Sequence, residues 1–97
     1  MMGRRGLFKF RLYVAADTLN SAQAIANLNA LCRAHLTGRH EIEIVDVFEE
    51  PQRALAENIR MTPTLLKLEP APARRIIGSL AKTQLVLDML GLETGVA

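Results

Sequence analysis

The sequence predicts a single α/β domain with the element order βαβαββα. Two observations predict the first half: alternating residues at 8–14 and an apolar segment at 41–47 lie on either side of a stretch with helical spacing. A third observation predicts the second half. A Thr-Pro step at residues 62–63 precedes two short apolar runs, which a proline-rich loop separates.

The first half is expected to form a right-handed βαβ unit with parallel strands. Apolar and polar side chains alternate through residues 8–14, as in a strand. Asn20 is the expected N-cap of the helix, with Gln23 completing a capping box, and apolar residues continue at helical spacing to His35. Residues 41–47 alternate and then become continuously apolar, which is typical of a strand covered on both faces.

A short helix is expected next, over residues 52–59. Pro51 is typical of the first turn of a helix. The helix would bury Leu55 and Ile59, and the step before Pro63 ends it because a residue that precedes proline avoids the helical region.

The remaining residues predict a hairpin and a last helix. The hairpin joins residues 65–68 to residues 74–77, and the helix begins at Ser79 or Lys82 and runs through residue 92. Residues 84–90 fit a helical stripe only loosely and also alternate as a strand would, so periodicity alone does not decide between the two.

A βαβ unit followed by ββα, with a proline at the start of the third strand, is the arrangement of the thioredoxin fold. In such folds this proline is usually cis, although cis bonds are a small minority of all X-Pro bonds. The sequence therefore predicts a thioredoxin-like fold.

Composition indicates one globular domain over residues 1–97, with flexible ends at 1–7 and 93–97. Hydrophobic residues make up 49% of the chain and charged residues 23%, which excludes disorder as a class. Lys9 and Arg11 interrupt any signal-peptide core, and no apolar run is long enough to span a bilayer. The single cysteine rules out an internal disulfide, so we expect a cytoplasmic protein without membrane association.

No catalytic constellation is found, and we expect no cofactor and no metal. A thioredoxin-type enzyme needs Cys-x-x-Cys where the first strand meets the first helix, but residues 15–18 contain no sulfur. Cys32 lies on the apolar stripe of the helix and is expected to be buried. His35 and His40 lack partners at ligand spacing, and no phosphate-binding glycine loop is present.

Three basic residues form the main candidate site. Arg74 and Arg75 are adjacent, and the predicted hairpin places Lys67 beside them. They could protect an exposed strand edge by charge, or they could bind an acidic protein surface. RNA binding is less favoured because no aromatic residues alternate with these charges, and a net charge of +2 is small for a nucleic-acid binder.

A set of short blocks in this sequence is typical of one known family. The blocks are Leu12-Tyr13-Val14-Ala15, Thr18, Asn20-Ser21, Leu28-Asn29, Asp46-Val47, Pro51-Gln52, Thr62-Pro63-Thr64-Leu65, Lys67, Pro70, Pro72 and Arg74-Arg75-Ile76-Ile77-Gly78. With these blocks the chain resembles the KaiB family, which comprises small clock proteins that bind the ATPase KaiC, and the likeness extends over residues 8–92.

The resemblance implies a non-enzymatic regulator that binds a KaiC-type ATPase ring and, in a complete clock, KaiA. It transfers the partner-binding role of cationic positions to Lys67, Arg74 and Arg75. The output that it implies is circadian timing or a stress response.

The resemblance also implies that two folds are accessible. The ground state would keep the N-terminal βαβ half, rearrange the C-terminal half and form a homotetramer or dimer, whereas the thioredoxin-like monomer would bind the partner. The expected fold-switch positions are Pro51, Pro63, Pro70, Pro72 and Gly78. The undecided pattern at residues 84–90 agrees with a C-terminal half whose two packings differ by only a few kcal/mol.

The sequence departs from the family at Ala16, Asp17 and Leu19, where clock members usually have Gly, Asn and Pro, and it ends at Ala97 without their frequent acidic extension. We therefore expect a divergent relative. Histidine-kinase sensor domains also resemble KaiB, and we expect this chain to act without an attached kinase. The alternatives are a thioredoxin relative that lacks the active cysteine pair and a small basic RNA-binding module.

Overall fold

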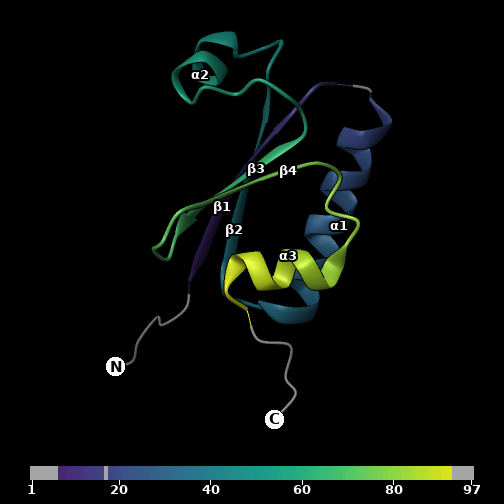
Figure 1. Cartoon of the computed structure of the whole chain (residues 1–97), viewed down its shortest axis with the longest axis vertical. Coiled ribbons are helices and arrows are strands. Elements are labelled where there is room, and N and C mark those ends of the chain that lie inside the picture. Colours follow the sequence, from purple (N-terminus) through teal and green to yellow (C-terminus); the bar gives the residue numbers. More distant parts are fainter. Residues whose placement is uncertain (1–6, 17, 93–97) are drawn as a thin grey trace.

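The computed structural model describes residues 7–16 and 18–92. Its elements follow the predicted order βαβαββα (Figure 1). They are β1 (Phe8–Val14), α1 (Leu19–His35), β2 (His40–Asp46), α2 (Pro51–Ala56), β3 (Thr64–Glu69), β4 (Arg74–Ile77) and α3 (Thr83–Leu90). Most of the predicted flexible ends, 1–6 and 93–97, lie outside the described residues.

The strands form one mixed sheet in the order β2-β1-β3-β4. β1 pairs with β2 in parallel, as the βαβ prediction requires, and with β3 in antiparallel orientation. β3 and β4 form the predicted hairpin, in which Lys67 lies opposite Arg74. The third strand therefore lies next to the first, and β2 and β4 are the two edges of the sheet.

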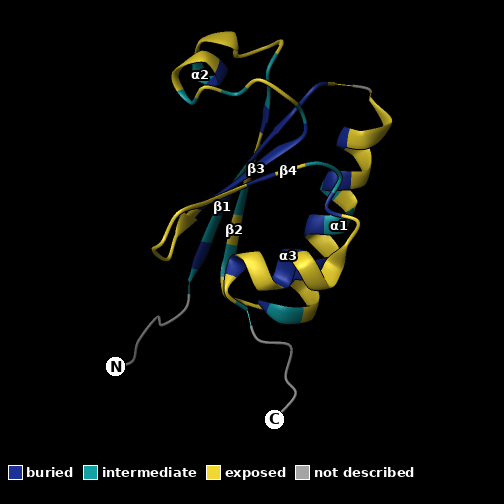
Figure 2. Ribbon diagram, in the orientation of Figure 1, coloured by how far each residue is buried: buried dark blue, intermediate teal, exposed yellow. Residues whose placement is uncertain are grey.

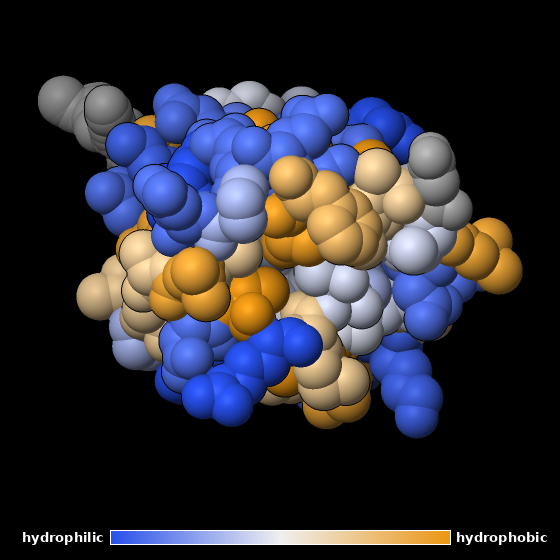
Figure 3. All heavy atoms as spheres, turned by 90° about the horizontal axis from the view of Figure 1, so that it is seen from above, coloured by the Kyte–Doolittle hydropathy of each residue, from blue (hydrophilic) through white to orange (hydrophobic). Residues whose placement is uncertain are grey.

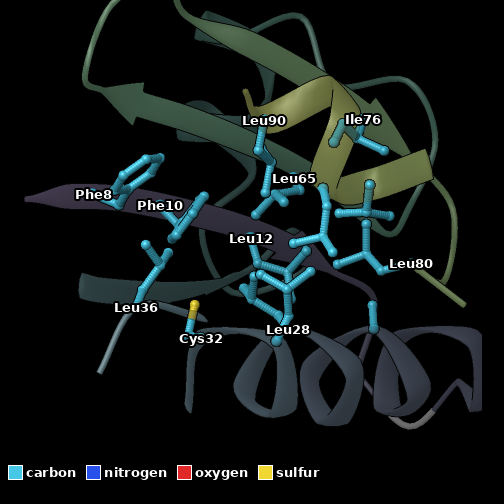
Figure 4. Close-up of a cluster of buried hydrophobic side chains, with 14 of the residues drawn as sticks. Phe8, Phe10, Leu12, Leu28, Cys32, Leu36, Leu65, Ile76, Leu80 and Leu90 are labelled. Atoms are coloured by element: carbon cyan, nitrogen blue, oxygen red, sulfur yellow. The ribbon is translucent and has the colours of Figure 1, made fainter. Parts of the chain in front are cut away.

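The larger core lies between one face of the sheet and the helices α1 and α3 (Figures 1 and 4). Phe8, Phe10, Leu12 and Val14 point to this side because side chains in a strand alternate. The stripe that α1 contributes includes the fully buried Leu28, so the predicted helix amphipathicity is confirmed.

A smaller core lies on the opposite face, under α2. Tyr13, Val45 and Leu66 from three strands pack there against Ala54, with Ile59 at the margin. The prediction that the helix buries Leu55 is wrong: this side chain is 78% exposed, and the shorter helix turns Ala54 toward the sheet instead. In Figure 2, α2 is accordingly mostly exposed.

Two local predictions are corrected. The N-cap of α1 is Thr18, whose hydroxyl accepts a hydrogen bond from the Ser21 N–H, and not Asn20. β2 is an edge strand that is not covered on both faces: Val45 is buried, but Ile44 is 43% exposed.

The segment that the sequence left undecided is a helix, α3. Its buried residues are Val86, Leu87 and Leu90, which share one helical face, whereas a strand would bury every second residue. Gly91 ends the helix in the left-handed conformation (φ 77°) that glycine adopts without steric cost. No helix among the described residues is long and apolar enough to cross a membrane.

Candidate partner-binding site

The three predicted cationic residues lie on the β3–β4 hairpin, but their side chains face different surroundings. Arg74 and Arg75 are neighbours in one strand and therefore point to opposite faces of the sheet. Arg74 is opposite Lys67 on the face that packs against α1 and α3, and Arg75 is opposite Leu66 on the α2 face. The hairpin thus presents two exposed arginines and one buried lysine.

Lys67 is almost completely buried, with 3% of its surface exposed. Its Nζ donates to the carbonyl oxygen of Leu90 at 3.3 Å and lies 5.7 Å from the centre of the Phe8 ring. Burial, together with the positive charge of Arg74, lowers the pKa of Lys67. A cation at this carbonyl is favourable because the C-terminal end of a helix carries partial negative charge. In this fold Lys67 therefore attaches the end of α3 to the sheet.

Arg75 is exposed but held in place by the backbone beyond α2. Its guanidinium donates to the carbonyl oxygens of Glu57 at 2.9 Å and of Asn58 at 3.4 Å. These contacts join β4 to the segment after α2 and fix the direction of the side chain. Asn58 has a positive φ of 58°, which asparagine tolerates better than most residues.

An open hollow of about 300 Å³ adjoins the hairpin on the surface. Residues from β3, β4 and the end of α2 line it, among them all three predicted cationic residues: Glu57, Leu66, Lys67, Leu68, Ala73, Arg74 and Arg75. The hollow therefore combines positive charge with aliphatic surface, a mixture that suits a protein partner.

A network of ion pairs lies beside α2, on the face of the sheet that this helix covers. Glu43 accepts a hydrogen bond from Arg11 at 2.8 Å and forms an ion pair with Arg53 at 2.9 Å, and Arg53 also donates to Glu50 at 3.3 Å. The hydrogen bonds from Arg53 and Arg11 lower the pKa of Glu43 to about 2. Arg11 also approaches Glu57 at 3.7 Å, so the charges of this patch largely pair with one another.

The predicted fold-switch positions lie mainly around β3 and β4. Gly78 donates its N–H to the carbonyl oxygen of Pro63 at 2.9 Å, so these two positions are in direct contact. The peptide bonds before Pro63, Pro70 and Pro72 are cis, and at Pro63 this agrees with the prediction. Pro51 lies outside this hairpin region and occupies the first turn of α2.

Cys32, the single cysteine, does not have the environment of a reactive thiol. Cys32 lies within the larger core, fully buried, and burial raises its pKa to about 11 (Figure 4). Its thiol is therefore protonated at neutral pH and shielded from solvent, the reverse of a reactive cysteine.

Two polar side chains of α1, Ser21 and Asn27, make hydrogen bonds that the sequence did not predict. The buried hydroxyl of Ser21 accepts a hydrogen bond from the N–H of Ala15 at 3.0 Å. The Asn27 amide donates to the carbonyl oxygen of Ser79 at 2.8 Å and so links α1 to the connection after β4. The pairing of Asn27 with Ser79 has no local sequence signal, because the two residues are far apart in the chain.

Exposed apolar side chains gather at the α2 end of the molecule. Phe48, Leu55 and Met61 lie before, in and after this helix and are 73%, 78% and 61% exposed. Figure 3 views the molecule from this end, where apolar residues lie among hydrophilic ones in the middle of the face. This surface is a second region at which a protein could bind.

His40 makes a contact with the backbone after α1. The His40 Nδ1 is 2.8 Å from the carbonyl oxygen of Leu36, and this contact holds the ring against the turn after α1. Within residues 7–16 and 18–92, no group of three or more potential ligands could hold a metal ion.

Comparisons with known proteins show which family this chain is similar to. Residues 11–92 match the model of the KaiB domain. The circadian clock protein KaiB3 of Synechocystis sp. is 47% identical over 83 residues, which cover 86% of this chain and 79% of the relative. The circadian clock oscillator protein KaiB of Thermostichus vulcanus is 39% identical over 94 residues, covering 94% and 87% of the two chains.

Solved structures support the fold independently. Chloroplastic thioredoxin z superposes with a TM-score of 0.75 at 22% identity, covering 94% of this chain and 82% of that structure. The N-terminal domain of SasA from Synechococcus elongatus gives 0.73 at 18% identity, covering 100% and 95%. At such low identity these likenesses establish the thioredoxin-like fold alone. The sequence matches go further, and they show that the chain belongs to the KaiB family.

Proposed function

We propose that this protein is a regulator that binds a KaiC-type ATPase ring and, where a complete clock is present, KaiA. KaiB-family proteins are non-enzymatic clock components. The observation that carries the proposal is the family match over residues 11–92, together with relatives named as circadian clock proteins. The regulated output is circadian timing or a stress response. We propose that the protein acts in the cytoplasm.

The proposed contact surface is the β3–β4 hairpin. Arg74 and Arg75 are exposed and form no ion pair with any carboxylate of the described residues, so both remain available to an acidic partner. Lys67 belongs to the proposal in a different way. Because its ammonium is buried beneath the end of α3, direct contact requires that end to move.

We also propose that the C-terminal half exchanges between this fold and a second packing that assembles as a homotetramer or dimer. Two features support the proposal: the ambiguous pattern at residues 84–90, and the concentration of three of the four prolines between residues 63 and 72. A gap of a few kcal/mol would suffice for both packings to be populated.

A thiol-redox function is disfavoured by the buried Cys32 and its raised pKa. The RNA-binding alternative has no support from the hairpin, where Arg74 and Arg75 diverge to opposite faces of the sheet instead of forming one continuous basic groove.

Co-elution tests the proposal directly. The purified chain is mixed with a KaiC-type ATPase ring in each nucleotide state and separated by size with light-scattering detection, with thioredoxin as the fold-matched control. We expect the chain, but not thioredoxin, to move with the ring. A chain that elutes alone in every nucleotide state would exclude this partner.

Dilution tests the second fold separately. Light scattering should give about four times the 10.7 kDa chain mass, or twice that mass for a dimer, at high concentration. NMR spectra recorded over the same dilution should show a second set of peaks growing as the mass falls. A single set of peaks at every mass would contradict fold exchange.

A further inference from the structure

The outer edge of β4 has unpaired backbone groups. β4 is the last strand of the sheet, and Gly78 donates to Pro63 on the β3 side. In an antiparallel ladder, hydrogen-bonded and non-hydrogen-bonded pairs alternate. The N–H and C=O groups of Ile77 and Arg75 therefore point away from β3, and no group of the described residues pairs with them.

The side chains along this edge divide into a cationic end and an aliphatic end. The sequence Arg74-Arg75-Ile76-Ile77 places one arginine and one isoleucine on each face of the sheet. Ile77 is 55% exposed. Beside the aliphatic end lies a hollow of about 240 Å³ between β4 and α3, whose lining includes Leu80 and Leu85.

We propose that the outer edge of β4 binds an extended segment of a partner protein by strand addition, and that this segment has two aliphatic residues followed by two acidic ones. Strand addition supplies main-chain hydrogen bonds, and side-chain pockets select the sequence. In antiparallel pairing, the aliphatic pair would lie opposite Ile77 and Ile76 and the acidic pair opposite Arg75 and Arg74. The proposal deepens the function above, because the same two arginines supply its charged contacts.

Charge decides between this occupant and a second copy of the chain. Two paired β4 edges would bring four arginines to one short strip without any carboxylate opposite them, whereas an acidic segment supplies two carboxylates to pair with Arg74 and Arg75. Charge on an edge can simply prevent aggregation, but the exposed Ile77 beside the two arginines offers an aliphatic contact that protection does not require. The contacts that hold Arg75 also fix one of the two charges before a partner arrives.

A peptide titration tests the proposal without the ATPase. The probe is a fluorescent octapeptide with Val-Ile-Asp-Glu at its centre, and the control has the same composition in the order Val-Asp-Ile-Glu. We expect the probe to bind about tenfold more tightly than the control, a difference of about 1.4 kcal/mol. Equal affinities, or no binding of the probe, would overturn the proposal.

Amide exchange of the wild-type chain locates the binding. In the free protein the amides of Arg75 and Ile77 should exchange quickly, while those of Arg74 and Ile76 are protected by β3. Binding of the probe should slow the exchange of the Arg75 and Ile77 amides. If the outward amides stay unprotected at saturation, binding occurs through side chains alone and strand addition is wrong. A doubled mass without peptide, with the same two amides protected, would assign the edge to a second copy.

Two substitutions at Ile77 test whether the ATPase ring binds the outer edge of β4. Ile77→Pro removes an outward N–H without breaking a bond to β3, and Ile77→Ala removes the side chain but keeps that N–H. We expect Ile77→Pro to weaken ring binding more than Ile77→Ala. Equal binding by both would reject strand addition to the ring and leave the proposed function intact. Probe binding without ring binding would reject the ring as partner and leave the strand site intact.

Discussion

Lys67 and Arg74 face each other across the β3–β4 hairpin, yet Arg74 is exposed and Lys67 is almost fully buried. The ammonium of Lys67 reaches the last carbonyl of α3, while its aliphatic stem lies in the core. A charge that the sequence assigns to a binding surface therefore also stabilises the attachment of a helix.

Substitutions at Lys67 should separate packing from charge. Lys67→Ala removes the buried stem and the hydrogen bond to Leu90, and we expect a loss of about 2 kcal/mol in the free energy of unfolding. Lys67→Met keeps the volume and removes a buried charge, so it should remain within about 1 kcal/mol of wild type. Urea unfolding at neutral pH measures both, and equal losses would show that the ammonium is essential.

Glu43 should make stability depend on acidic pH. Its pKa is lowered to about 2 in the folded protein, against about 4.3 in an unfolded chain. Between these pKa values the unfolded state binds more protons than the folded state. The stabilisation that Glu43 contributes is therefore fully present above the unfolded pKa and is lost as pH falls toward 2.

The matched variants are Glu43→Gln and Glu41→Gln, two residues apart on the same strand. Glu41 makes no ion pair within the described part of the chain. From pH 6 to pH 3, the urea midpoint should fall less for Glu43→Gln than for wild type or Glu41→Gln, and high salt should reduce the difference because Glu43 is half-exposed. Parallel curves for all three proteins would refute the role of the network.

The cap of α1 provides another matched pair. Thr18→Ala removes the hydroxyl that accepts from Ser21, and we expect it to cost about 1 kcal/mol. Asn20→Ala changes an exposed residue inside the first turn and should have an effect within about 0.5 kcal/mol of zero. Thermal unfolding followed by circular dichroism compares them, and the reverse order of effects would restore Asn20 as the cap.

Tyr13 carries a buried hydroxyl for which the described residues offer no hydrogen-bond partner. Burying such a group without a partner costs about 1–3 kcal/mol. Tyr13→Phe should therefore raise the free energy of unfolding by about 1 kcal/mol. A loss of stability in this variant would mean that the hydroxyl has a bonding partner under α2.

The sequence predicted what depends on local pattern. The order of elements, the parallel βαβ unit and the burial of Cys32 followed from alternation, helical spacing and residue type. The burial of Lys67 could not be predicted, because it depends on the end of a helix at Leu90, far along the chain. Leu55 was placed wrongly because α2 is so short that a one-residue shift changes which side chain faces the sheet.

Charge reversal on the hairpin tests the central claim most directly. Arg74→Glu with Arg75→Glu is compared with Arg33→Glu with Arg39→Glu, which changes the charge equally at exposed positions at and after the end of α1. The measurement is the Kd for a KaiC-type ATPase ring, after circular dichroism has shown that both variants are folded. We predict that the hairpin variant binds at least about tenfold more weakly and that the control binds as wild type does. Undiminished binding by the hairpin variant would contradict the proposed surface.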